Sequence, residues 1–261
     1  MIKFFRKIRQ RLLTENKFSK YLFYAIGEIV LVVIGILIAL SINNWNENRK
    51  LRTEEIKALE NFKISIGSDL YSNNWHKRQF DVAKNSINLL IEHMESDLPY
   101  QDSLKFHFGN TGQNWEPYIS YDAFEMLKSG SFSLISNEQL RSDIVTYYSF
   151  AENAFEPLAT RYSNIMEHAQ KNIYNSRFNA SYEINLKPNL DFHYEGEVKD
   201  VGFQMIPNDY EDLKKDKEYM YFLKTQKNQL YWYMERNLNI GNYFAENLYN
   251  SIDKELSELK K

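Results

Sequence analysis

The most apolar part of the chain is a single stretch close to its first residue. Between Tyr21 and Ile42 the only charged side chain is Glu28, and most of the other residues are Ile, Val, Leu, Ala or Gly. As an α-helix this stretch would be about 33 Å long, which matches the roughly 30 Å of hydrocarbon in a bilayer. The pattern therefore predicts one transmembrane helix over residues 21–42.

Beyond residue 42, apolar side chains recur every three or four positions, which is typical of amphipathic helices. Two stripes predict long helices over residues 46–95 and 212–259, and a third predicts a helix capped by Ser136 or Asn137. The third stripe consists of Leu140, Ile144, Tyr147, Ala151, Phe155, Leu158, Tyr162, Ile165, Ala169 and Ile173. Pro157 is expected to kink or split this helix near Asn153, because proline lacks a backbone N–H.

The remaining segments predict one short helix and two loops. The short helix covers Tyr121–Lys128, and the loops cover residues 96–119 and 179–209. Only 9 Gly and 5 Pro occur in 261 residues, which argues against an all-β fold. The sequence thus predicts an all-α protein in which a single N-terminal transmembrane helix continues into an elongated antiparallel bundle. This bundle has three long helices plus one short helix, and a small hairpin in the 180–209 loop.

The charges predict how the chain is oriented. Residues 1–20 hold seven basic side chains and one acid, and the rest of the chain is net acidic. Lysine and arginine concentrate on the cytoplasmic side of membrane proteins, and a basic segment is attracted to anionic lipid. We therefore expect a basic cytoplasmic tip at 1–20, the membrane helix at 21–42 and a domain at 43–261 outside the membrane, with no nucleic-acid partner. Tyr21, Tyr24 and Trp45 would anchor the helix at the two interfaces.

A removable signal peptide is the alternative to a retained anchor. Ala39-Leu40-Ser41 resembles a cleavage site with small residues. However, the apolar run is longer than the usual core of a signal peptide and begins late. The length favours the retained anchor.

Three residues of the predicted membrane helix share one face. Glu28, Gly35 and Ala39 are separated by seven and four positions, and Gly35 and Ala39 form a small-x-x-x-small pair that lets two helices approach closely. A carboxylate about 9 Å into the hydrocarbon is costly, so an oligomer seam that hides Glu28 is one interpretation. Passive snorkelling toward the headgroups is a second, and proton or ion coupling is a third.

Motifs that would indicate an enzyme are absent from the sequence. There are no cysteines, the five histidines are scattered singly, and no phosphate loop or nucleophile motif occurs. We therefore expect no catalytic residues, no metal and no cofactor. The last predicted helix carries aromatic side chains partly off its apolar stripe, which either widen the core or form a face for a protein or a sugar. They are Tyr219, Phe222, Trp232, Tyr233, Tyr243 and Tyr249.

Two stretches resemble a known family. The opening, MIKFFRKIRQRLLTENKFSKYLFYAIGEIVLVVIGILIALSINNWNE, is similar to the N-terminal signature of a domain-of-unknown-function family of bacterial membrane proteins common in Bacteroidetes. Residues 124–148, FEMLKSGSFSLISNEQLRSDIVTYY, resemble its second recurrent block. The resemblance implies a single-pass inner-membrane protein with a periplasmic helical domain, and it implies no activity.

These observations favour a membrane-anchored periplasmic interaction or scaffold protein that associates with itself. Its expected partners are membrane lipid, its own copies and an unknown membrane or periplasmic protein. The alternatives are an energy-coupling, stator-like subunit that uses Glu28, and an enzyme of unrecognised class.

Overall fold

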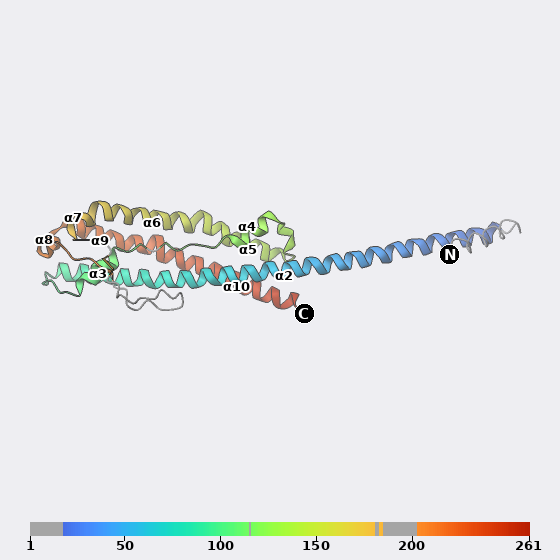
Figure 1. The fold of residues 1–261 in the computed structure, drawn as a ribbon, viewed down its shortest axis with the longest axis horizontal. Coiled ribbons are helices and arrows are strands. Elements are labelled where there is room, and N and C mark those ends of the chain that lie inside the picture. The colour runs from blue at the N-terminus through green and yellow to red at the C-terminus, as the bar shows by residue number, and fades with distance from the viewer. Residues whose placement is uncertain (1–17, 115, 181–182, 185–202) are drawn as a thin grey trace. The chain divides into compact units, whose positions relative to one another are not determined.

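The computed structural model describes residues 18–114, 116–180, 183–184 and 203–261 (Figure 1). The chain divides into two compact units, Met1–Ile56 (unit 1) and Lys57–Lys261 (unit 2). Most of the predicted basic tip, residues 1–17, lies outside the described residues. The described residues are 84% helical with almost no strand, so the predicted all-α class is confirmed.

A single helix, α2, covers Phe18–Glu95 and contains both the predicted membrane segment and the first predicted long helix. Its residues from Lys57 onward form the first helical rod of unit 2. The second rod is the continuous run α5 (Glu138–Phe150), η2 (Ala151–Phe155), α6 (Glu156–Ala169), η3 (Gln170–Tyr174) and α7 (Asn175–Arg177). The third is α9 (Lys217–Gln229), η4 (Leu230–Glu235) and α10 (Arg236–Leu259). The segments η2, η3 and η4 are π-helical.

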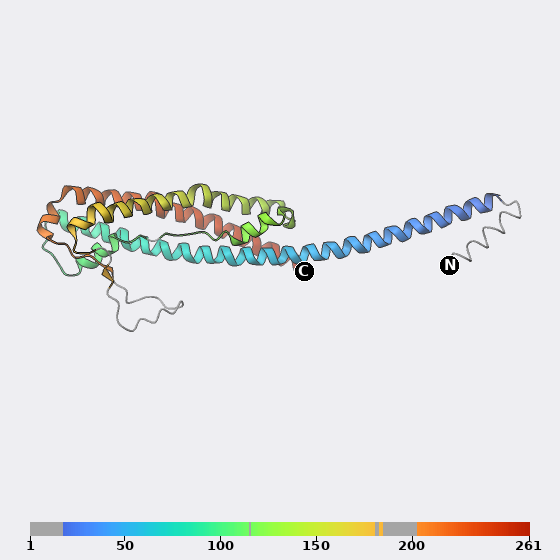
Figure 2. The ribbon, with the colours of Figure 1, turned by 45° about the horizontal axis from the view of Figure 1, so that its top comes forward.

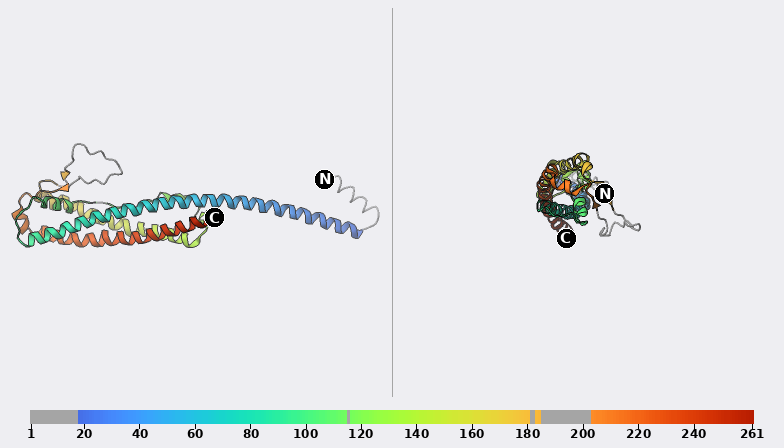
Figure 3. Two further views of the ribbon diagram at one scale, coloured as in Figure 1. Left: turned by 90° about the horizontal axis from the view of Figure 1, so that it is seen from below. Right: turned by 90° about the vertical axis from the view of Figure 1, so that its left-hand side faces the viewer.

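The three rods of unit 2 lie side by side, and the third runs antiparallel to the other two (Figures 1, 2 and 3). The first and second rods run in the same direction, because the segment between α3 and α4 carries the chain back along the bundle. In that segment Pro117 and Ile119 are buried while Glu116 and Tyr118 are exposed, as expected for extended backbone against a core.

Helix α3 (Leu104–Thr111) lies in a region that was predicted to be a loop, so that prediction was wrong for these eight residues. The helix packs against strand β2 (Phe203–Gln204), and Met205 N donates to Lys105 O at 2.9 Å. Gly109 permits this contact, because a Cβ there would lie 2.1 Å from Phe203 O. Eight residues are too few to form a stable helix alone, so tertiary contacts stabilise α3.

Within the predicted 180–209 loop, β1 (Glu183–Ile184) and β2 form a two-residue antiparallel ladder, while residues 192–201, where alternating aromatic and valine side chains suggested the hairpin, lie outside the described residues. Helix α8 (Tyr210–Lys215) follows, and Asp216, which has extended backbone, separates it from α9. The Asp216 side chain accepts hydrogen bonds from Glu218 N and Tyr219 N, so it caps α9. The C-terminal helix therefore begins at Lys217 rather than at residue 212.

The other predicted helices are found close to their expected bounds. Helix α4 covers Asp122–Ser129, and the short 3₁₀ turn η1 covers Phe132–Leu134. The cap of α5 is Asn137, whose side chain accepts from Leu140 N at 3.1 Å.

The π-helical segment η2 contains Asn153, the position where Pro157 was expected to disturb the second rod. A π-helical turn holds an extra residue and can move inward-facing positions beyond it by one, although Tyr162, Ala169 and Ile173 stay buried as predicted. Ala159 and Met166 are buried in the core, whereas Leu158 and Ile165 are only half-buried. The predicted stripe was therefore wrong at Leu158 and Ile165.

Candidate functional site

The apolar segment of α2 is one candidate site, and nearly all of its described side chains are exposed. Among the described helices, α2 is the one long and apolar enough to cross a membrane, and its most apolar window has a mean hydropathy of 2.8 with none of it buried. An exposed apolar surface of this extent is typical of contact with lipid or with another protein. The structure is thus compatible with membrane anchoring.

The predicted seam residues Glu28, Gly35 and Ala39 all lie on this continuous helix. Glu28 is half-buried, and a Cβ built on Gly35 would meet no atom within 4 Å. The surface at Gly35 is therefore open, as a helix–helix contact would require. The assembly of these residues into a seam stays a prediction.

The aromatic anchors differ in how much the structure describes. Trp45 is exposed, and the Arg49 guanidinium lies 5.3 Å from the centre of its ring. Tyr21 and Tyr24 lie in α2, but their side chains are outside the described part of the chain.

A buried polar layer crosses unit 2 where the apolar stripe of α2 weakens. Asp69 is 2% exposed, and Asn73 and His76 are also buried. They continue the inward-facing spacing that includes Ile66 and Phe80. The signal in the sequence that marks them is that polar residues stand at core positions of this helix.

Asp69 links three parts of unit 2. One carboxylate oxygen accepts from Ser120 N at 2.9 Å, and the other accepts from the Tyr147 hydroxyl at 2.8 Å. Burial raises the pKa of Asp69 to about 6, and the two hydrogen bonds oppose this rise. Burial also raises the pKa of Tyr147, and the nearby Asp69 charge adds to that rise. Asp69 can therefore hold a proton in mildly acidic solution, where a free aspartate has already lost it.

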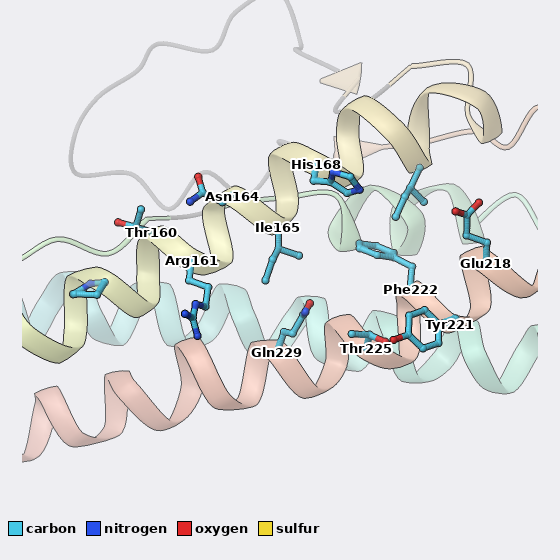
Figure 4. A pocket seen from close by; sticks show the side chains of 12 residues that line it. Thr160, Arg161, Asn164, Ile165, His168, Glu218, Tyr221, Phe222, Thr225 and Gln229 are labelled. Atoms are coloured by element: carbon cyan, nitrogen blue, oxygen red, sulfur yellow. The ribbon is translucent and has the colours of Figure 1, made fainter.

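A groove between the second and third rods is the other candidate site (Figure 4). It consists of two adjoining cavities of about 620 and 300 Å³, which share Thr225 and Gln229. Figure 4 shows the side chains of Arg161 and Ile165 pointing from α6 toward α9. The side chains of Phe222 and Gln229 belong to α9 on the other side of the groove. The larger cavity is lined by Pro157, Thr160, Arg161, Asn164, Ile165, His168, Ile173, Glu218, Tyr221, Phe222, Thr225 and Gln229. The smaller one adds Leu158, Asn228, Trp232, Tyr233 and Arg236.

The charges of this groove are unequal at its two ends. Arg161 lies over the ring of Tyr233 at 5.7 Å, and Arg236 lies over the ring of Trp232 at 5.9 Å. At the other end Glu218 is neutralised by an ion pair of 2.5 Å with Arg177. The groove therefore presents net positive charge near η4.

The sequence left open whether the aromatic residues of the last rod widen the core or form an accessible face, and the structure contains both kinds. Tyr219 and Phe222 are buried in the core. Trp232 is 57% exposed and Tyr243 is 64% exposed, while Tyr233 and Tyr249 are half-buried. Part of the set widens the core, and part of it forms an accessible face.

The described residues contain no group of three or more His, Asp or Glu side chains that could hold a metal ion. The histidines have local roles instead. His76 hydrogen-bonds with Ser72 O at 2.8 Å, and His93 with Pro99 O at 2.9 Å.

Comparison with known proteins identifies one related region. Residues 28–148 match a family described as "Family of unknown function (DUF6090)", so this part of the chain is an uncharacterised domain. The matched region extends from Glu28 through α2, α3 and α4 to Tyr148 in α5. No curated protein and no solved structure matches the chain.

Proposed function

We propose that this chain is a bacterial inner-membrane protein whose periplasmic helical unit serves as an interaction or scaffold module. In this proposal residues 21–42 are a retained single span, the N-terminus is cytoplasmic, and unit 2 is periplasmic. The observation that carries the proposal is the exposed apolar segment of α2, which no described part of the chain covers. The match to a family of unknown function is compatible with it.

We further propose that copies associate through the face that holds Glu28, Gly35 and Ala39. A carboxylate within hydrocarbon is costly unless it is protonated or partnered, and a second helix would shield it. Small residues at Gly35 and Ala39 let that helix approach closely, which is how membrane helices commonly pack.

The absence of cysteine from the chain makes a disulfide test direct. Ala39→Cys should give a crosslinked dimer in oxidised membranes, whereas Leu37→Cys, about 200° around the helix, should not. A dimer that forms equally from both variants, or from neither, would contradict the seam. Sidedness is tested separately: Lys254→Cys should react with a membrane-impermeant maleimide from the periplasmic side alone.

A second candidate function rests on Glu28, because acids inside membranes often carry protons or ions. In this alternative the chain is an energy-coupling subunit of a larger membrane complex. Glu28→Gln distinguishes the two. A scaffold should keep its crosslinked dimer and its captured partners, whereas a coupling subunit should assemble normally and lose proton flux in reconstituted vesicles.

A further inference from the structure

The groove between the second and third rods has an apolar floor on which Leu158 and Ile165 are only half-buried. Both side chains line this groove, Ile165 in the larger cavity and Leu158 in the smaller one. Phe222 borders it from α9, and Trp232 and Tyr233 border it from the π-helical segment η4. π-helical segments of this kind frequently occur at functional sites. Together the two cavities fall within the usual size range of ligand sites, roughly 300–1,000 Å³.

In the part of the chain that the structure describes, the two arginines of the groove lack the ion pairs that other basic side chains between the rods form. Lys84 reaches Glu235 at 2.7 Å, and Arg177 reaches Asp216 at 2.8 Å. Arg161 and Arg236 have no carboxylate partner within the described residues, although they extend from facing rods. Each is instead held against an aromatic ring, which positions the guanidinium and leaves its N–H groups available.

The centre of the groove also contains an unused acceptor. The Oε1 atom of Gln229 is buried and accepts no hydrogen bond from the described part of the chain. Leaving such a group unsatisfied costs about 1–3 kcal/mol, so native proteins normally provide it with a donor. An ordered water at this position would supply that donor, because the headgroup and alkyl chain of an anionic amphiphile offer only acceptors.

We propose that this groove binds a single-chain amphiphilic anion. The alkyl chain would lie on the floor formed by Leu158, Ile165 and Phe222, and a carboxylate, phosphate or sulfonate headgroup would lie between Arg161 and Arg236. Guanidinium groups bind such headgroups with charge-assisted, often bidentate hydrogen bonds. A second copy that packed through this same face is a poorer occupant, because it would bring further unpaired guanidinium groups to the same cationic end.

The inference is independent of the proposed scaffold function, and its test uses the full chain in nanodiscs of neutral phospholipid. The probe is dodecanoic acid with a diazirine near the end of its chain, and the labelled residues are mapped by mass spectrometry after irradiation. We expect saturable labelling of residues 157–173 and 218–236, which excess dodecanoate removes and excess dodecanol does not. Labelling confined to residues 22–42 would overturn the proposal, since it would show partition into lipid only.

Two kinds of variant test the roles of the charges and of the cavity. The double variant Arg161→Gln, Arg236→Gln should reduce groove labelling by about tenfold or more at low probe concentration. Lys128→Gln, an exposed cation on α4, is the matched control and should leave labelling unchanged. Thr225→Trp should block both cavities while it keeps both arginines. Labelling that persists in either groove variant, or that is equal with a neutral diazirine alcohol, would contradict an anion site.

Discussion

The buried carboxylate Asp69 leads to a specific prediction about the pH dependence of stability. The pKa of Asp69 is about 6 in the folded protein and 3.8 for the free side chain. Between these values the folded chain keeps a proton that the unfolded chain has lost. The free energy of unfolding therefore falls as the pH rises from about 4 to 6, by about 3 kcal/mol in total. Below pH 4 both states are protonated, and this loss is absent.

Asp69→Asn should remove this dependence. The amide is nearly the same shape, its oxygen can still accept from Ser120 N, and its NH₂ group can donate to the Tyr147 hydroxyl. We expect the variant to match the wild type near pH 4 and to become more stable than it above pH 6, by up to about 3 kcal/mol.

The measurement is urea unfolding of the full chain in micelles, followed by near-ultraviolet circular dichroism from pH 3.5 to 8. The difference in unfolding free energy between variant and wild type is the quantity to plot, because groups common to both proteins cancel. A difference that stays constant across this range would refute the reasoning. Tyr147→Phe provides a second check. It removes a donor that holds the pKa of Asp69 down, so the pH window should move upward.

Three further substitutions test contacts in unit 2. Gly109→Ala should detach β2 from α3, because the new methyl group would overlap Phe203 O. The expected result is faster hydrogen exchange of the Met205 amide, and an unchanged exchange rate would contradict the prediction. Asp216→Ala removes the cap of α9 and should cost about 1–2 kcal/mol of unfolding free energy, measured by urea denaturation, whereas Asp216→Asn should keep most of the cap. Asn237→Ala removes the buried donor to Phe155 O, at 3.0 Å, and should cost about 1–3 kcal/mol in the same assay; a loss under 0.5 kcal/mol would show that this carbonyl of η2 finds water instead.

The long helices could be predicted because their apolar spacing is regular over many turns. The stripe Phe62, Ile66, Phe80, Ile87 is buried as expected. Helix α3 could not be predicted in this way, because its eight residues form a helix only when β2, about a hundred residues later, packs against them.

The candidate sites show the same limit. Glu28 stands out in the sequence because one acid lies among apolar residues. Asp69 does not, because its burial depends on Ser120 and Tyr147, which reach it from other segments. The groove was not predicted either, since Arg161 and Arg236 come to border adjoining cavities only after the second and third rods pack.

The π-helical segment η2 has a consequence for how this sequence can change in length. Removing one residue from Ala151–Phe155 would convert the segment into regular α-helix and leave Ala159 and Met166 facing inward. The same deletion within α6 would turn every later side chain of that rod by about 100° and expose its core face. Single-residue gaps between this chain and its relatives should therefore collect at η2, and by the same reasoning at η3 and η4.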